Sequence, residues 1–294
     1  MVCIKQREIQ TFNLKLLQGA DEESKDGEVV KPQNVKELGV CEMSALSVKF
    51  APSGRYFAVL SENDFIIYTY PKYQNAAFGS ATELVWSTSG ANDTHTYACR
   101  TENGTVKVYQ NFAEFKAFKT AFANEGIFGG RLLAIKSKDF VTFYDWEEFS
   151  VVRRVDVASA IKHVIWSDDG NQLVLALEDT FYLLQFNAKY VAETLASGGL
   201  TDEQVEDGLE DAFTFTDEFS EVVVSGLWVS NECFVWINNR GNINYLIGGR
   251  VMKLGNSGKK QFILGYDAKQ NRLYLVDKSL TIHAHRLLMS VLQF

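Results

Sequence analysis

The sequence predicts an all-β fold, a β-propeller of about seven blades. Short stretches that alternate apolar and polar residues recur along the chain, and turns rich in Gly, Ser, Asp or Asn separate them. The most regular copy is 164–186, VIWSDDGNQLVLALEDTFYLLQF, which reads as three antiparallel strands joined by two turns. One such sheet cannot bury both of its faces alone, so radial packing of similar sheets explains the repetition.

Six aromatic residues mark the end of a strand in successive copies of this unit. Most of the intervals between them are about 40 residues, the period of a four-stranded blade. The interval from Trp166 to Trp228 is longer and requires an insertion of about half a blade. The six positions are Phe50, Trp86, Phe128, Trp166, Trp228 and Tyr266.

The blades are assigned from this pattern. Residues 1–43 form a partial first blade without its innermost strand, with strands at 9–17 and 35–43 and a polar loop at 19–27. Asn103-Gly104 and 239–241 are hairpin signals. The complete blades are expected at 46–71, 83–119, 132–157, 164–186, 222–250 and 261–286.

The segment 200–221, LTDEQVEDGLEDAFTFTDEFSE, interrupts the repeat and predicts a short acidic helical insertion between blades. Thr201 followed by Gln204 is typical of a helix start. Val205, Leu209, Ala212 and Phe213 follow at helical spacing. Two roles stay open for this insert: a solvated helix that covers a sheet edge, or a helix that docks a partner.

Composition limits the range of functions. The 294 residues suit a single domain, 1–294, and 46% hydrophobic content provides a core. A net charge of −8 disfavours nucleic acid and anionic membranes as direct ligands. The chain shows no signal-peptide order and no apolar run long enough to span a bilayer. Four cysteines without CxxC spacing indicate reduced thiols in a cytosolic protein: Cys3, Cys41, Cys99 and Cys233.

No group of residues predicts catalysis, a metal or a cofactor, so we expect a protein that is not an enzyme. His283 and His285 share one strand face but lack a third ligand, and we interpret them, with His95 and His163, as rim or surface histidines. The pairs Asp168-Asp169 and Glu147-Glu148 indicate hairpin turns. The glycine pairs and the short basic run lack the context of a phosphate loop or a nucleic-acid site; they are 129–130, 198–199, 248–249 and 259–260.

Segments such as 36–43, 65–69, 78–86 and 205–213 resemble the second β-propeller of the coatomer beta-prime subunit family. The signature of WD repeats is degraded here, with Asp145-Trp146 at one position where a Trp-Asp pair closes a strand. The resemblance extends from about residue 8 to the end of the chain and includes the acidic insert. The segments that carry it are 36–43, 65–69, 78–86, 143–146 with 152–154, 205–213, 226–229, 242–245 with 248–249, and 264–266 with 271–278.

This resemblance implies a WD40-like propeller that acts as a scaffold of the COPI coat in Golgi-to-ER retrograde and intra-Golgi transport. It implies other coatomer subunits as partners, the alpha subunit foremost. It also implies a cytoplasmic location, peripheral on Golgi membranes and COPI-coated vesicles. Residues 287–294 are expected to begin a connection to an α-solenoid. Dilysine cargo tails are expected on a first propeller, which is not in this chain. The alternative is a propeller that reads a peptide or sorting signal at the mouth of its channel.

Overall fold

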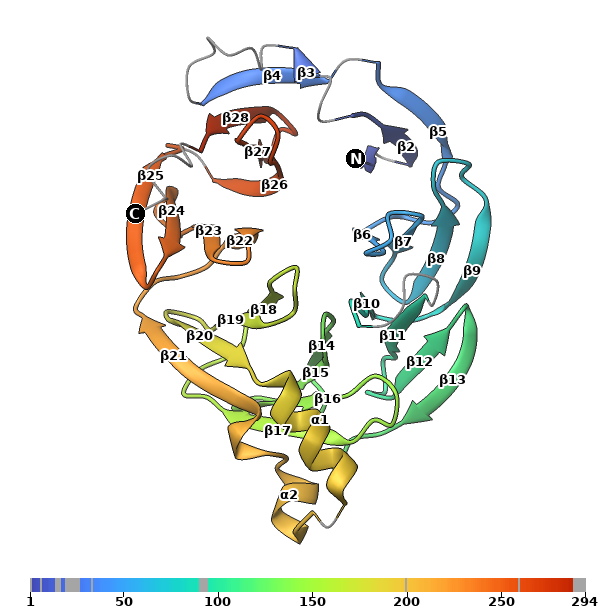
Figure 1. Ribbon diagram of the computed structural model, residues 1–294. Helices are drawn as coiled ribbons and strands as arrows, with labels where there is room; N and C mark the ends of the chain where they lie inside the picture. The colour runs from blue at the N-terminus through green and yellow to red at the C-terminus, as the bar shows by residue number, and fades with distance from the viewer. Residues whose placement is uncertain are drawn as a thin grey trace.

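A computed structural model shows seven antiparallel sheets arranged in a ring (Figure 1). The structure describes residues 2–5, 7–13, 17–18, 27–32, 34–89, 95–198, 200–258 and 260–287. The prediction of an all-β propeller with about seven blades is confirmed. No helix within these ranges is long and apolar enough to cross a bilayer.

Blades 2 to 6 each contain four strands in chain order, from the innermost to the outermost (Figure 1). Blade 2 contains β6 (Ser47–Phe50), β7 (Tyr56–Leu60), β8 (Asp64–Thr69) and β9 (Asn75–Ser80). Blade 3 contains β10 (Glu83–Trp86), β11 (Thr96–Arg100), β12 (Val106–Gln110) and β13 (Ala113–Phe118). Blade 4 contains β14 (Gly126–Phe128), β15 (Leu133–Lys136), β16 (Phe140–Tyr144) and β17 (Val151–Asp156). Blade 5 contains β18 (His163–Trp166), β19 (Gln172–Ala176), β20 (Phe181–Phe186) and β21 (Phe213–Phe219). Blade 6 contains β22 (Ser225–Ser230), β23 (Cys233–Ile237), β24 (Asn242–Ile247) and β25 (Arg250–Asn256).

Strand alternation explains why these sheets stack around a ring. In β19, Leu173 and Leu175 pack in the cluster shared with blade 4, whereas Val174 and Ala176 pack in the cluster shared with blade 6. All four side chains are fully buried. Successive side chains point to opposite faces of a sheet, so a middle strand that is apolar at every position needs a neighbouring blade on both sides.

Blades 1 and 7 depart from the simple order. Blade 1 has three strands, β1 (Val2–Lys5), β2 (Glu8–Thr11) and β5 (Lys36–Val40). Between β2 and β5 the chain crosses to blade 7 and adds β4 (Glu28–Pro32) and β3 (Leu17–Gln18) outside β26 (Gln261–Asp267), β27 (Arg272–Asp277) and β28 (Ile282–Arg286) (Figure 1). β4 pairs antiparallel with β28, and the two ends of the chain therefore share one sheet.

This topology corrects the assignment of residues 1–43 to the first blade alone. The strand expected at 9–17 ends at Thr11, and β4 belongs to the last blade. An edge strand takes its partner from the fold, and local sequence does not specify whether that partner is near or distant in the chain. Of the expected polar loop at 19–27, only Gly27 lies within the described residues, and of the expected connection at 287–294 only Leu287 does.

The insert also differs from the single helix expected at 200–221. A short acidic helix is present, α2 (Asp202–Glu206), and Thr201 begins it with a capping box to Gln204. However, 213–219 is β21, the outer strand of blade 5, where alternating Phe and Thr residues favour a strand. A second helix, α1 (Ala188–Ser197), precedes α2, and a 3-10 turn at Glu210–Ala212 leads into β21.

Candidate interaction surfaces

The six marker aromatics lie on innermost strands, and five of them pack in the junctions between blades. The exception is Phe50, which is 37% exposed. Phe50, Trp86, Phe128 and Trp166 end β6, β10, β14 and β18, and Trp228 and Tyr266 lie near the ends of β22 and β26. The Trp86 indole Nε1–H donates to the Lys49 carbonyl oxygen at 3.2 Å. The Trp228 indole donates to the Ile165 carbonyl oxygen at 3.1 Å.

In both bonds the acceptor is the residue just before the aromatic marker of the preceding blade. These aromatics therefore join neighbouring blades, and Trp86 and Trp228 are only 7% and 5% exposed. The alternative function, a propeller that reads a peptide at the mouth of its channel, would be favoured by exposed Trp or Tyr side chains there. It stays a prediction.

Polar contacts also connect neighbouring blades near the axis. Glu83 on β10 accepts a hydrogen bond from the Ile127 backbone N–H on β14 at 2.8 Å. Lys136 on β15 donates to the Ile161 carbonyl at 3.2 Å, just before β18. Ser225 on β22 accepts from the Ile263 N–H on β26 at 3.0 Å. Each bond restrains one blade against the next, so the ring resists shear between sheets.

Close packing explains the glycine pair at 129–130. A Cβ on Gly129 would lie 2.2 Å from the Trp86 carbonyl oxygen. A Cβ on Gly130 would lie 2.1 Å from the Trp166 ring, and Gly130 has φ +124. Only glycine allows the segment just after β14 to approach the Trp86 backbone and the Trp166 ring this closely.

The two carboxylate pairs lie in separate hairpins, as the sequence predicted. Asp169 accepts from the Ser167 hydroxyl at 2.6 Å and from the Asn171 backbone N–H at 3.0 Å. Burial tends to raise the pKa of Asp169, but these hydrogen bonds lower it below its ordinary value. The side chain organises the β18–β19 turn.

Glu147 and Glu148 lie in the β16–β17 hairpin, which Asp145 organises. Asp145 Oδ1 accepts from the backbone N–H groups of Glu147 and Glu148 at 2.9 and 2.7 Å. Asp145 Oδ2 accepts from the N–H and hydroxyl of Ser150 at 2.7 and 2.6 Å. Burial tends to raise the pKa of Asp145, but the hydrogen bonds outweigh burial and the pKa is lowered.

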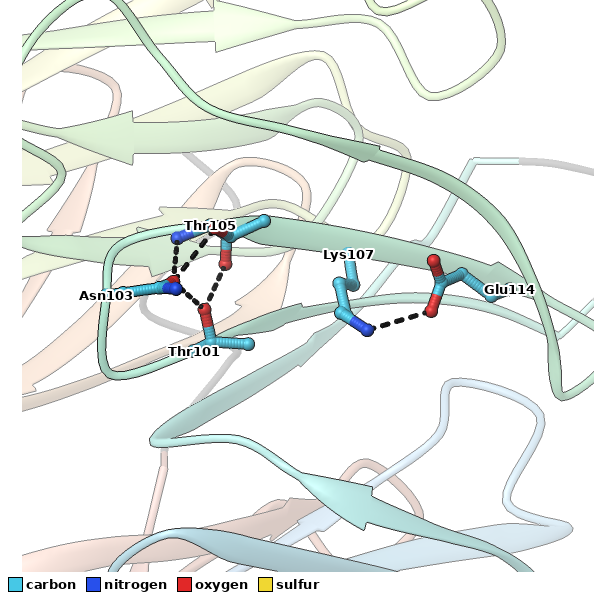
Figure 2. A network of polar contacts seen from close by, with 5 residues as sticks. All are labelled: Thr101, Asn103, Thr105, Lys107 and Glu114. Carbon is cyan, nitrogen blue, oxygen red and sulfur yellow. Dashed lines mark hydrogen bonds and ion pairs between the residues drawn. The ribbon is translucent and has the colours of Figure 1, made fainter.

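The hairpin between β11 and β12 shows how a predicted turn is built (Figure 2). Asn103 Oδ1 accepts from the Thr101 hydroxyl at 2.7 Å and from the Thr105 hydroxyl at 2.8 Å. Gly104 follows with φ +78, the conformation that Asn-Gly turns require. Further along this edge, Lys107 forms an exposed ion pair with Glu114 at 3.0 Å. The turn is a structural element of blade 3.

The histidines on β28 face the strand that the amino-terminal segment contributes. His283 Nδ1 lies 3.2 Å from the Gly27 carbonyl oxygen, and His283 Nε2 lies 3.5 Å from Asp277 Oδ2. The interpretation of His285 as a rim or surface histidine is wrong, because β4 covers β28 and His285 is buried, with its ring beside Gly27. Within the described ranges, no three His, Cys, Asp or Glu side chains form a group that could hold a metal ion.

His163 and His95 also have structural surroundings. Burial, Lys136 and Lys162 lower the pKa of His163, so this side chain is neutral at pH 7. His95 packs edge-on against the Tyr56 ring, with 4.5 Å between the ring centroids.

The cysteines are free thiols, and three of them are buried. Burial raises the pKa of Cys233 to about 11 and raises the pKa of Cys99 further. A thiol with a raised pKa is protonated at neutral pH and reacts slowly. Cys99 and Cys233 pack in the apolar clusters of the junctions between blades.

The insert covers the outer edge of blade 4. The Leu209 N–H donates to the Val152 carbonyl at 2.8 Å, and the Arg154 N–H donates to the Asp207 carbonyl at 2.7 Å. Gly208 has φ +80, and a Cβ there would lie 2.5 Å from the Val152 backbone. The insert thus pairs with β17, an edge strand that would otherwise expose unpaired backbone groups. This contact supports the first of the two roles predicted for the insert.

A groove lies between α1, the helix just before the insert, and the β16–β17 hairpin, and we call it the insert groove. Its volume is about 620 Å³, and α1 forms one wall with Ala188, Val191, Ala192, Leu195 and Ala196. Trp146, Glu147 and Glu148 are on the opposite wall. The helix α1 was not predicted, although its apolar residues recur at helical spacing from Ala188 to Leu195.

The fold and these surfaces define a class: a β-propeller of WD40-like type. Comparison with known proteins identifies the particular family. Residues 6–277 match the family model described as "COPA/B second beta-propeller". The chain therefore belongs to the COPA/B second beta-propeller family.

Curated relatives agree with this family. The chain is 39% identical over 295 aligned positions to "Coatomer subunit beta'" from Rattus norvegicus and from Homo sapiens. The same values hold for "Coatomer subunit beta'-2" from Oryza sativa subsp. japonica. Each alignment covers 100% of this chain and 31% of the relative. The chain thus spans about a third of the length of these relatives.

Solved structures support the fold alone. A chain in "Crystal Structure of Mitotic Checkpoint Complex" superposes with a TM-score of 0.63 at 12% identity, covering 97% of this chain and 83% of the other. The Cps50 (Swd1) β-propeller domain from Myceliophteria thermophila gives a TM-score of 0.66 at 10% identity, covering 97% and 96%. Sequence identity this low carries no information about function.

Proposed function

We propose that this domain is a non-enzymatic scaffold of a COPI coat subunit. The observation that carries the proposal is the family match over 6–277, supported by 39% identity to coatomer beta' subunits across the chain. Its proposed role is to hold neighbouring parts of the subunit at a fixed angle during retrograde and intra-Golgi vesicle formation. Other coatomer subunits are its proposed partners, the alpha subunit foremost.

The architecture suits this role for a physical reason. Apolar clusters fill the junctions between blades, and hydrogen bonds such as Trp228 to Ile165 connect the same sheets. A spacer in a coat must resist bending when the membrane curves, and close-packed sheets have low compressibility. We propose a cytoplasmic location on Golgi membranes, with membrane contact through the assembled coat. Dilysine cargo tails are proposed to bind elsewhere in the subunit.

The test is reconstitution with the whole coat subunit. One version lacks the segment equivalent to this domain, and a second carries an unrelated seven-bladed propeller in its place. The proposal expects the deletion to abolish assembly of coated vesicles from Golgi membranes. Partial recovery by the unrelated propeller would indicate a spacer, and no recovery would indicate specific contacts. Normal coat assembly by the deletion version would contradict the proposal.

A further inference from the structure

The insert groove combines an apolar wall with an acidic border. On α1, Ala192 and Ala196 are exposed, and Leu195 is half-buried. Val191 is buried in the apolar cluster between blades 4 and 5, and it anchors α1 to that core. Because alanine side chains are short, α1 approaches the hairpin without filling the space between them. Apolar surface therefore remains open to an occupant.

The opposite wall is held in place before any ligand arrives. The four hydrogen bonds accepted by Asp145 fix the hairpin backbone. The buried Trp146 indole donates to the Gly130 carbonyl oxygen at 3.0 Å. A groove with preformed walls binds a segment with less loss of conformational entropy than a flexible surface does.

The border of the groove is acidic. Glu147 and Glu148 are exposed, and neither carboxylate has an ion-pair partner in the described part of the chain. At the other end, Leu200 leads into α2, whose first turn carries Asp202 and Glu203. These carboxylates attract cations.

Nearby cations offset this charge only in part. Arg131 lies in the groove lining. Lys116 donates to the Glu148 backbone carbonyl and lies over the Phe149 ring. Arg154 bonds Asp156 and lies near Asp207. None of these three forms an ion pair with the carboxylate of Glu147, Glu148, Asp202 or Glu203 in the described ranges.

We propose that the insert groove docks a short basic segment of a partner protein, with small apolar side chains against α1 and Lys or Arg side chains toward Glu147, Glu148 and α2. Charge complementarity favours this occupant over an acidic peptide or an anionic surface. A volume of about 620 Å³ is within the range of specific ligand sites. This proposal does not depend on the role in a coat.

The test uses the full chain and two sets of short synthetic peptides. In the first set Lys or Arg alternates with Ala, Val or Leu; in the second, Glu replaces the basic residues. Fluorescence anisotropy measures affinity, and hydrogen exchange locates the bound peptide. We expect members of the basic set to bind, to protect α1 and 145–150, and to bind more weakly as salt rises. The acidic set should not bind.

Two pairs of variants give the matched comparison. Ala192→Trp fills the groove, and Ser197→Trp introduces the same side chain at an exposed position of α1 outside the groove lining. We expect Ala192→Trp to weaken binding at least about tenfold and Ser197→Trp to leave it unchanged. Glu147→Gln with Glu148→Gln should weaken binding by about three- to tenfold, while Glu232→Gln, in the exposed β22–β23 turn, should have no effect. Unchanged circular dichroism and melting temperature show that each variant is folded.

Three results would overturn the proposal. The first is equal binding of basic and acidic peptides, or no binding by any member of the basic set. The second is full affinity of the folded Ala192→Trp variant. The third is a dimer in analytical ultracentrifugation that Ala192→Trp abolishes, because the groove would then be an interface between copies of this chain.

Discussion

The ring has two junctions of very different construction. We call the packing of blade 4 against blade 5 and the insert the braced junction, and the packing around β4, blade 7 and Phe12 the closing junction. In the described residues, the buried cluster of the braced junction has sixteen members, whereas that of the closing junction has four: Val30, Tyr274, Ile282 and Ala284. Hydrophobic stabilisation scales with buried apolar area, so the braced junction is expected to be the more stable.

Backbone pairing follows the same contrast. β21 pairs with β20 over six residue pairs, from Phe181 with Phe219 to Phe186 with Phe213. β4 pairs with β28 over three, from Ile282 with Val30 to Ala284 with Glu28. A ring of similar blades therefore need not be uniform in stability. It should open first where the amino-terminal segment closes it.

The largest expected effect comes from the braced junction. Phe143 is fully buried, and its ring packs 4.8 Å from the Phe213 ring between centroids. We expect Phe143→Ala to lower the free energy of unfolding by about 3–5 kcal/mol, because it leaves a cavity in the core. Urea denaturation measures this loss. Phe78→Ala is the matched control, since Phe78 is 82% exposed and its loss should cost less than about 0.5 kcal/mol.

Val30→Ala tests the closing junction and should cost about 2 kcal/mol. Val30 is 1% exposed and belongs to the short β4 strand. We expect the loss to appear as local release of β4, with faster proteolysis and amide exchange at 28–32 and a smaller change elsewhere. A uniform loss of protection across the ring would show that the closing junction is part of one cooperative unit.

Asp145→Asn should destabilise the hairpin by about 1–3 kcal/mol, because an amide nitrogen cannot accept the two bonds from Ser150. The folded-state pKa of Asp145 is below its ordinary value of 3.8. The stabilisation from the carboxylate is therefore complete above pH 3.8 and lost as pH falls through the lowered pKa. Denaturation at several pH values should show the difference between wild type and variant shrinking in acid. A constant difference would contradict this assignment.

Glu114→Gln should have the smallest effect, below about 0.5 kcal/mol, because the Lys107–Glu114 pair is exposed. Added salt should remove any difference in the free energy of unfolding between wild type and variant. Denaturation at low and high ionic strength measures this change. A loss comparable with that of Val30→Ala would mean that edge charges matter as much as junction packing.

Much of the fold could be predicted from sequence because the repeat is local. An aromatic such as Trp86 or Trp166 ends the innermost strand, and the turn after it follows from residue type. The hairpins at Asn103-Gly104 and Asp169 could be predicted for the same reason, because their turns follow from residue type. These features depend on a few adjacent residues and on strand alternation.

The parts that were missed depend on distant contacts. Nothing in the sequence 28–32 specifies that β4 pairs with β28 rather than with a strand of the first blade. Helical spacing from Val205 to Phe213 obscured the Phe-Thr alternation of 213–219, which pairs with β20 as a strand. The α1 helix carried a readable signal at 188–195, yet the groove beside it required the position of the β16–β17 hairpin.

Hydrogen exchange on the whole chain tests the central contrast most directly. If the ring opens at its closing junction, amides of β4 and of its partner β28 exchange well before those of β20 and β21. The difference in protection should correspond to at least about 2 kcal/mol of opening free energy. Equal protection of β4 and β21, or earlier exchange in β21, would contradict the account.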